Sequence, residues 1–243
     1  MNISDTTFQL ETRIALPEDE VQLWQIVLAS VAPAERRWEQ ILSADERSRA
    51  ARFHFAQDRQ FFTATRAILR MILGSYLDSN PSELVLQYSE KEKPSLHPSS
   101  SADQLEFNVS HSGSVAMLAF SRGRAVGVDV EQLRDNFDHE AIARRFFSAE
   151  ERGQLAALSP AERYHGFFRC WTRKEAYIKA HGAGLSLPLH QFDVSLKPGD
   201  QSALLATRPE STVAAAWSLR DIPVCDGYAA ALCVQGHGWR LKF

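Results

Sequence analysis

Residues 159 to 184 read SPAERYHGFFRCWTRKEAYIKAHGAG and predict one long helix. Ser159 is a suitable N-cap, Pro160 suits the first helical position, and Glu162 completes a capping box three residues after the cap. Gly182 and Gly184 end the run. This segment therefore carries its own start and stop signals, and we use it as the reference for the rest of the chain.

The apolar face of this helix is interrupted by a carboxylate. Phe168, Trp171 and Ile178 recur at the spacing of one buried face, and Glu175 takes the position between the last two. An ionised carboxylate in an apolar setting is costly unless a metal or a basic partner compensates it. Alternatively, Glu175 lies at a wet edge of the helix and forms an ordinary i, i+4 ion pair with Lys179. The helix alone leaves both interpretations open.

A second carboxylate pair lies in the sequence VGVDVE at residues 126–131. Valines occupy alternate positions, so Gly127, Asp129 and Glu131 face the other side of the predicted strand, with the two carboxylates about 6.6 Å apart along it. Such a pair has little meaning by itself, but hard oxygen ligands held this close suit Mg²⁺. Together with Glu175, the pair indicates a site with three carboxylates.

Composition predicts a globular protein without a membrane segment. The chain has 243 residues, 44% of them apolar and 23% charged, which is enough for one large core or two modest ones. No N-terminal secretory signal and no bilayer-length apolar run occur, so we expect a cytoplasmic protein. Cys170, Cys225 and Cys233 are odd in number and lack metal-ligand spacing, which fits a reducing compartment. A net charge of −3 gives no long-range case for nucleic acid.

The first part of the chain predicts a strand followed by two helices. The strand covers Val21 to Leu28, the first helix runs from Ser43 to Phe53 with Ser43 and Glu46 in a capping box, and the second runs from Asp58 to about Tyr76. One face of the second helix is an apolar row of Phe61, Thr65, Leu69 and Ile72. Another face carries Arg59, Thr63, Arg66 and Arg70. That basic face is either solvated or binds phosphate, and the helix by itself does not decide between the two.

A loop and a short strand follow. Pro and Ser are frequent from Glu90 to Asp103, which predicts a loop in which Pro94 holds Lys93 extended. A strand over Leu105 to Val109 then runs into Ser110 to Gly113, which we interpret as a compact polar turn. Within that turn, His111 is either a plain turn residue or, beside backbone amides that point at a ligand, a phosphate-binding group.

The chain repeats two of its own patterns at a nearly constant offset. Ser43 to Arg47 resembles Ser148 to Arg152, 105 positions later, and Phe61-Phe62 resembles Phe167-Phe168, 106 positions later. This predicts a duplicated unit of about half the chain. Val115 to Phe120 supplies a strand of the first half. The last segment supplies strands at Phe192 to Leu196, Val213 to Leu219, Tyr228 to Val234 and Trp239 to Lys242. We therefore expect two α+β halves, 1–121 and 122–243, with the boundary near Ser121 to Arg124.

These motifs occur together, in this order, in one known family. The chain resembles the 4′-phosphopantetheinyl transferases of the Sfp type over nearly its whole length. The matching segments are the Ser43 to Arg70 region, Lys93-Pro94, Phe107 to Gly113, Val126 to Glu131, Arg145 to Ser148, Trp171 to Ala176 and Gly182 to Leu185.

The resemblance implies a fold and an activity. The expected fold is α+β, a pseudo-dimer of two similar halves in a monomer, with the active site in the cleft between them. The expected reaction moves 4′-phosphopantetheine from coenzyme A to a serine hydroxyl of an acyl or peptidyl carrier protein and releases 3′,5′-ADP. Such carriers serve fatty acid, polyketide and nonribosomal peptide synthesis.

The resemblance also implies roles for individual residues. Asp129, Glu131 and Glu175 would hold Mg²⁺ on the coenzyme A pyrophosphate. Lys93, Ser110 and His111 would hold the nucleotide end, with Lys174 and Lys179 near the phosphates. A basic position of the family falls on Glu46 here, which leaves Arg49 and Arg52 as the candidates for the 3′-phosphate. Glu175 would accept the serine proton, directly or through a water, and Lys179 would stabilise the leaving diphosphate.

Two other functions compete with this one. The first is a magnesium-dependent hydrolase of a nucleotide pyrophosphate, in which water replaces the carrier serine and ADP is released without any carrier. The second is a non-catalytic protein that binds coenzyme A. The clustered carboxylates Asp129, Glu131 and Glu175 disfavour the second function, because packing alone gives no reason to keep charges that repel each other.

Overall fold

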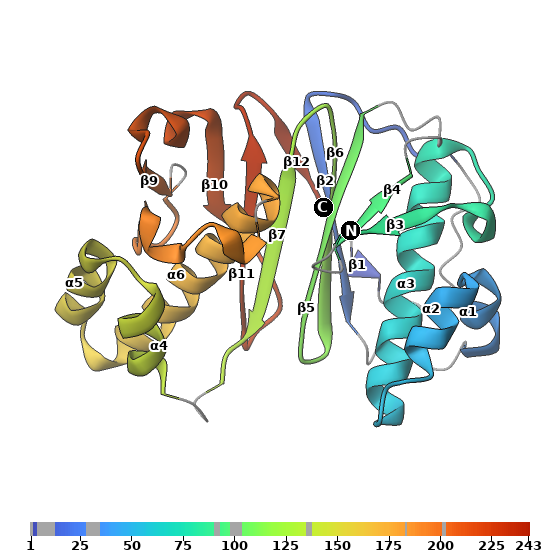
Figure 1. The fold of residues 1–243 in the computed structure, drawn as a ribbon, viewed down its shortest axis with the longest axis horizontal. Helices are drawn as coiled ribbons and strands as arrows, with labels where there is room; N and C mark the ends of the chain where they lie inside the picture. Colours follow the sequence, from blue (N-terminus) through green and yellow to red (C-terminus); the bar gives the residue numbers. More distant parts are fainter. Residues whose placement is uncertain are drawn as a thin grey trace.

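The computed structural model is a mixed α+β structure in four layers. It describes residues 2–3, 13–27, 35–89, 93–97, 104–134, 138–182, 184–200 and 203–243. Figure 1 shows helices α1 to α3 on one side, two sheets in the centre, and helices α4 to α6 on the other side. The predicted end of the first strand at Leu28 and most of the predicted loop from Glu90 to Asp103 lie outside the described residues.

The first half packs three helices on a sheet. The strand order is β1-β2-β6-β5, with β12 also paired to β2. These strands are β1 (Asn2–Ile3), β2 (Glu20–Val27), β5 (Leu105–Ser112), β6 (Val115–Arg122) and β12 (Arg240–Lys242). The helices are α1 (Glu35–Ile41), α2 (Ala44–Ala50) and α3 (Ala56–Leu77), and a small hairpin joins β3 (Leu86–Tyr88) to β4 (Pro94–Leu96). The apolar row predicted on α3 is buried in this core.

The second half surrounds α6 (Pro160–His181). Its main sheet has the order β10-β11-β7, from β7 (Val126–Gln132), β10 (Trp217–Asp221) and β11 (Tyr228–Gln235). The remaining elements are α4 (His139–Phe146), α5 (Ala149–Ala157) and the paired strands β8 (Phe192–Val194) and β9 (Leu204–Thr207). Gly182, in the left-handed conformation at φ 80°, caps the C-terminal end of α6 as predicted.

The two main sheets pack against each other. Their shared core contains Val21, Leu23 and Met117 from the first sheet and the three alternate valines of β7 from the second. Gly127, Asp129 and Glu131 therefore face away from this core, as the strand pattern predicts. The C-terminal strand β12 returns to the first sheet, with Leu241 opposite Val21, so the end of the chain crosses the predicted boundary between the halves.

A row of polar side chains joins β5 to β7. Asn108 Oδ1, Ser110 Oγ and Ser112 Oγ accept hydrogen bonds from the backbone N–H groups of Val128, Val130 and Gln132 at 2.9, 3.3 and 3.1 Å. The three acceptors sit at every second position of β5, so one face of the strand satisfies alternate donors on the edge of the other sheet. These bonds fix the register between the two halves.

We expect Asn108→Ala to lower the free energy of unfolding by about 1–3 kcal/mol, the cost of leaving a buried donor without its acceptor. That donor is the N–H of Val128, which belongs to a fully buried residue. Denaturant unfolding measures the effect, with Gln87→Ala on the exposed side of β3 as the control. Equal stabilities of the two variants would contradict the role of this row.

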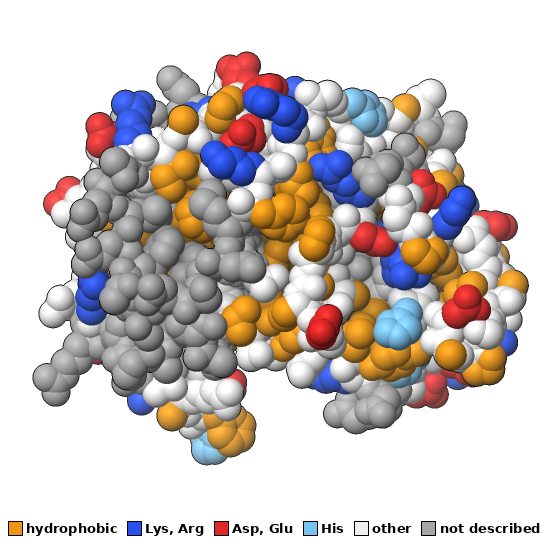
Figure 2. Space-filling model, turned by 180° about the vertical axis from the view of Figure 1, so that it is seen from behind, with side chains coloured by type: hydrophobic (Ala, Val, Ile, Leu, Met, Phe, Trp, Pro, Cys, Tyr) orange, Lys and Arg blue, Asp and Glu red, His pale blue; other side chains and the backbone are white. Residues whose placement is uncertain are grey.

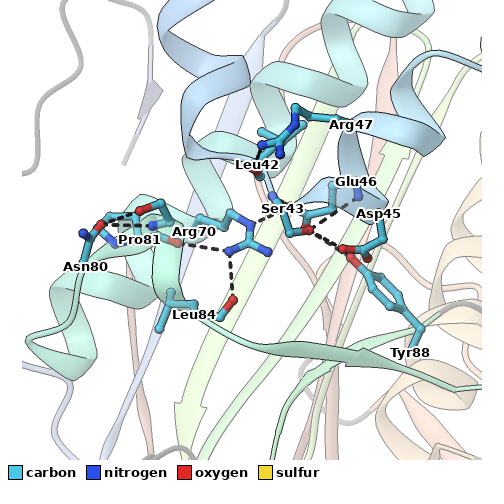
Figure 3. A network of polar contacts seen from close by, with 11 residues as sticks. Leu42, Ser43, Asp45, Glu46, Arg47, Arg70, Asn80, Pro81, Leu84 and Tyr88 are labelled. Atoms are coloured by element: carbon cyan, nitrogen blue, oxygen red, sulfur yellow. Dashed lines mark hydrogen bonds and ion pairs between the residues drawn. The ribbon is translucent and has the colours of Figure 1, made fainter.

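The internal repeat has a structural counterpart in two buried ion pairs. Ser43 with Glu46 and Ser148 with Glu151 form the two predicted capping boxes. Glu46 Oε2 also pairs with Arg70 Nε at 2.6 Å, and Glu151 Oε1 pairs with the Lys174 ammonium at 2.6 Å. Each acidic residue thus ties the start of a short helix to the long helix of its own half. Figure 3 shows the first network, in which the Arg70 guanidinium also reaches the carbonyls of Pro81 and Leu84.

Three local predictions differ from the structure. Strand β5 continues through Ser112, so only Gly113 of the predicted turn Ser110 to Gly113 lies in a turn; Ser110 and Ser112 belong to the polar row that joins β7. A 3₁₀ helix, Ser211–Ala216, occupies most of the predicted strand Val213 to Leu219, and β10 begins at Trp217, because three alanines precede it and alanine disfavours strands. Strand β4 (Pro94–Leu96) lies within the predicted loop from Glu90 to Asp103, where it pairs with β3.

The described surface shows no large area of a single charge on the face drawn in Figure 2. Lys and Arg side chains are interspersed there with Asp and Glu side chains and with small hydrophobic groups. Within the described residues, no helix combines the length and the apolar character needed to cross a bilayer. Cys170 and Cys233 are buried free thiols, and Cys225 is a partly exposed one.

Candidate active site

A close approach of α6 to β7 builds the site. A Cβ atom on Gly127 would lie 2.2 Å from the carbonyl oxygen of Ala176 and 2.3 Å from the backbone nitrogen of Ala180. Only glycine therefore lets the two backbones approach this closely. Because Asp129 follows Gly127 on the same face of β7, the helix brings Glu175 and Lys179 beside it.

A cavity of about 750 Å³ opens where the two halves meet. It falls within the size range of ligand-binding pockets, roughly 300–1,000 Å³. The wall from the first half includes Arg49, Phe62, Arg66, Lys93, Ser110 and His111. The wall from the second half includes Asp129, Glu131, Trp171, Glu175 and Lys179. Residues distant in sequence thus form one cavity with basic groups on one wall and carboxylates on the other.

Lys179 links the carboxylate wall to the strand β5. Its Nζ donates to Asp129 Oδ1 at 2.7 Å and to Ser110 Oγ at 2.8 Å, and Ser110 Oγ donates to the same Asp129 oxygen at 2.9 Å. Lys93 crosses from the first half and donates its Nζ to the backbone carbonyl of Lys179 at 2.8 Å. Both lysines therefore lie at the junction of the two halves.

Burial raises the pKa values of the three carboxyl groups, and the charges of neighbouring carboxylates add to the shift at Glu131 and Glu175. Burial, followed by the charge of Asp129, raises the pKa of Glu175 to about 7, although Lys179 opposes the shift. Burial also raises the pKa of Glu131, with a further contribution from Asp129, while a hydrogen bond from Ser112 lowers it. Asp129 is fully desolvated, and burial raises its pKa despite Lys179. The wall therefore concentrates negative charge that a cation can neutralise.

This cluster predicts a pH dependence of stability. A carboxyl group whose pKa rises on folding binds its proton more tightly in the folded state, so it stabilises the fold at low pH and this stabilisation is lost as pH rises toward the folded pKa. For Glu175 the window runs from about 4.5 to about 7. We expect Glu175→Gln to gain stability relative to the wild type across that window, by up to about 3 kcal/mol. Melting temperatures of both proteins from pH 5 to pH 8, without ligand, measure the gap; a gap independent of pH would contradict the shifted pKa.

The carboxylate oxygens of this wall fit a hard divalent cation whose remaining coordination positions are filled by a bound ligand or water. Asp129 Oδ2 is buried without a hydrogen-bond partner in the structure, and Glu131 and Glu175 line the same wall. In the described part of the chain, no three His, Cys, Asp or Glu side chains form a ready metal cage. Mg²⁺ does not require one, since it usually takes one or two carboxylates and leaves its other positions to water and substrate phosphates. The carboxylates fit this mode of binding.

The basic wall combines arginine side chains with aromatic rings. The guanidinium carbons of Arg49 and Arg66 each lie 5.5 Å from the centroid of the Phe62 ring. The exposed His111 ring stacks on Phe61, with centroids 6.1 Å apart. Arginines and aromatic rings side by side suit a nucleotide that carries phosphate, because rings can stack on a base and guanidinium groups bind phosphate oxygens.

Two of the predicted site residues lie elsewhere. Lys174 is fully buried, and its Nζ donates to the carbonyls of Leu189 and Phe192 as well as pairing with Glu151, so its charge is used inside the second half. Arg52 is exposed and does not belong to the lining of the cavity. The assignments of Lys174 to the phosphates and of Arg52 to the 3′-phosphate therefore lack structural support.

Sequence reasoning did not single out Arg66. The structure shows that the basic face of α3 is solvated only near its start, where Arg59 is exposed, whereas Arg66 and Arg70 are buried, with 8% and 1% of their surface exposed. Arg70 is used by Glu46, whereas Arg66 lines the cavity. The signal was present in the shared helix face, but helical periodicity does not distinguish a solvated face from a cavity wall.

Comparison with known proteins identifies relatives of the whole chain. Residues 125–233 match the model of the 4′-phosphopantetheinyl transferase superfamily, and residues 30–122 match that of the N-terminal part of 4′-phosphopantetheinyl transferase. The 4′-phosphopantetheinyl transferase HetI of Nostoc sp. is 40% identical over 230 residues, 95% of this chain and 94% of the relative. A putative 4′-phosphopantetheinyl transferase, slr0495, of Synechocystis sp. is 32% identical over 77% of this chain and 74% of its own. The transferase Sfp of Bacillus subtilis is 29% identical over 81% of this chain and 84% of its own.

Proposed function

The chain belongs to the 4′-phosphopantetheinyl transferase superfamily, and on that premise we propose that it moves 4′-phosphopantetheine from coenzyme A to a serine hydroxyl of an acyl or peptidyl carrier protein. The products are the holo-carrier and 3′,5′-ADP. The protein acts as a cytoplasmic monomer whose halves, 1–121 and 122–243, each supply one wall of the site.

One observation carries this proposal: the cavity combines a basic, aromatic wall from the first half with a carboxylate wall from the second. Coenzyme A carries groups that suit both walls. Its 3′-phosphorylated nucleotide suits the basic, aromatic wall, and the adjacent pyrophosphate, which binds Mg²⁺ readily, suits the carboxylate wall. The two walls would hold these two parts of one molecule, as ligands often bind between domains.

Each wall has its own binding role. Asp129, Glu131 and Glu175 would hold Mg²⁺. When bound, the ion would neutralise negative charge that builds up on the pyrophosphate. Arg49 and Arg66 are our candidates for the 3′-phosphate. Lys93 and His111 hold the rest of the nucleotide end. Ser110 lines the same wall, but its hydroxyl is engaged by Asp129 and Lys179, so we assign it to holding those two charges in place.

The reaction replaces the phosphoanhydride bond of the pyrophosphate by a phosphodiester bond to the carrier serine. The carrier serine oxygen bonds to the phosphorus next to the pantetheine, and the bond from that phosphorus to the bridging oxygen breaks, so that 3′,5′-ADP leaves with the bonding electrons. Glu175 takes the serine proton onto its carboxylate, directly or through a water. The ammonium of Lys179 stabilises the charge on the leaving diphosphate.

We expect Lys93→Ala and His111→Ala to raise KM for coenzyme A about tenfold and to leave kcat within about twofold, because binding that is equal in the ground and transition states affects KM alone. Both residues line the first-half wall of the cavity, which we assign to the nucleotide end. Steady-state kinetics with a saturating carrier separates the two parameters. A loss of kcat at unchanged KM would assign either residue to the chemical step instead.

Release of 3′,5′-ADP tests the transferase against the hydrolase. The protein is mixed with coenzyme A and Mg²⁺, with and without an apo-carrier, and the nucleotide is followed by chromatography. A transferase releases 3′,5′-ADP only with the carrier, in equal amount to the holo-carrier formed. Release without a carrier would favour a hydrolase, and binding of coenzyme A without release in either mixture would favour a binding protein.

A further inference from the structure

The guanidinium of Arg66 has a buried N–H donor whose hydrogen-bonding capacity the described residues do not satisfy. Its side chain lines the cavity with 8% of its surface exposed, and its Nη1 is buried without a hydrogen-bond partner in the structure. Leaving a buried donor of a charged group unpaired is unfavourable. The site around Arg66 is therefore complete only when an anion supplies an acceptor.

Two further guanidinium groups lie near Arg66. Arg49 and Arg70 both lie close enough to lower its pKa, in addition to the effect of burial. The nearby carboxylate of Glu46 opposes them, but its Oε2 is paired with Arg70 Nε at 2.6 Å. The Glu46 carboxylate is thus used by Arg70, and none of the described carboxylates forms an ion pair with Arg66.

Two aromatic rings contact the Arg66 guanidinium. The guanidinium carbon of Arg66 lies 5.5 Å from the ring centroids of both Phe62 and Tyr88. Tyr88 is itself fixed, because its hydroxyl donates to Glu46 Oε1 at 3.1 Å while the other oxygen of that carboxylate holds Arg70. Figure 3 shows Tyr88 with its hydroxyl turned toward the start of α2, where Glu46 lies. A chain of contacts therefore runs from the buried ion pair through Tyr88 to Arg66.

We propose that Tyr88 is a positioning residue that sets selectivity for the 3′-phosphate of coenzyme A, by holding Arg66 through its ring while leaving the guanidinium donors to the ligand. This inference rests on the proposed function for the identity of the ligand. A carboxylate in place of the ring would fix Arg66 equally well, but it would neutralise the guanidinium and compete with the phosphate. The ring attracts the cation without using its N–H groups.

Binding calorimetry with coenzyme A and with 3′-dephospho-coenzyme A tests the proposal on the full chain, without a carrier. The ratio of the two affinities measures how strongly the 3′-phosphate is recognised. We expect Arg66→Gln to reduce the ratio about tenfold or more, the effect of losing a hydrogen bond between charged groups. Tyr88→Leu, which lacks the ring, should reduce it at least about fivefold, whereas Tyr88→Phe, which keeps the ring, should retain most of it.

Tyr164→Leu is the matched control, since Tyr164 packs on Phe168 in the second half, outside the cavity. Its ratio should equal that of the wild type, and circular dichroism confirms that each variant is folded. A wild-type ratio in Tyr88→Leu would overturn the proposal, as would a wild-type protein that binds both ligands equally. The proposed function is judged separately by transfer to a carrier, so its failure would appear as lost transfer and not as lost selectivity.

Discussion

Replacement of Asp129 by alanine is expected to lower kcat for transfer at least about a hundredfold, equivalent to about 2.7 kcal/mol in the activation barrier. Asp129 is placed for two roles at once. Its Oδ1 holds the Lys179 ammonium, and its unpaired Oδ2 is buried beside Glu131 and Glu175. The variant thus loses a candidate Mg²⁺ ligand and releases the lysine assigned to the leaving group.

The same change should not unfold the protein. Asp129 is a buried carboxylate whose pKa is raised by desolvation, so removing it relieves an unfavourable burial, and the Lys179 side chain that loses its partner is 27% exposed and can be hydrated. We expect the melting temperature without ligand to stay the same or rise, as is common for groups that function requires and stability does not. Asp19→Ala, at an exposed surface pair with Arg240, controls for the general effect of losing an aspartate. Turnover of Asp129→Ala at saturating Mg²⁺ equal to that of the wild type would contradict both roles.

Gly127→Ala is expected to damage both the fold and the activity. The added methyl carbon would lie within 2.3 Å of backbone atoms of Ala176 and Ala180, which no side-chain rotation can relieve, so α6 must move away from β7. Overpacking of this kind costs about 1–3 kcal/mol of stability. The displaced helix carries Glu175 and Lys179, and a shift of about 1 Å in such groups can cost on the order of a hundredfold in rate.

The matched control for that prediction is Gly153→Ala on α5, where an added Cβ meets no atom within 4 Å. Because alanine favours a helix over glycine by about 1 kcal/mol, this variant should be equally or more stable and fully active. Thermal unfolding and transfer rates of the two variants are compared with those of the wild type. Equal behaviour of the two alanine variants would show that the contact between α6 and β7 does not build the site.

Local signals in the sequence account for much of the fold. The caps of α6, the two capping boxes and the alternating valines of β7 each lie within a few residues, and the structure confirms all of them. The turn predicted at Ser110 to Gly113 was wrong because polar residues at every second position can indicate a turn or a strand whose polar face meets another backbone. The partner strand β7 lies 20 positions away, and no local pattern reveals it.

The sequence predicted the acidic residues of the candidate site better than its basic residues. Asp129, Glu131, Glu175 and Lys179 share one cavity wall, as their spacing on one strand face and one helix face predicts. Lys174 follows the family motif in sequence, but neighbouring residues of a helix point about 100° apart, so it faces the interior of the second half when Glu175 faces the cavity. Arg66 could be recognised only in the structure, because the Tyr88 ring that it contacts comes from another element.

Intact-mass measurement of a carrier protein tests the central claim most directly. An apo-carrier is incubated with the protein, coenzyme A and Mg²⁺, in parallel with the same carrier whose modifiable serine is replaced by alanine. We predict that the first carrier gains the mass of one phosphopantetheinyl group, that the alanine carrier gains nothing, and that EDTA stops the reaction until Mg²⁺ is restored. No gain in mass across a panel of fatty acid, polyketide and nonribosomal peptide carriers, with a protein that still binds coenzyme A, would contradict the proposed transferase.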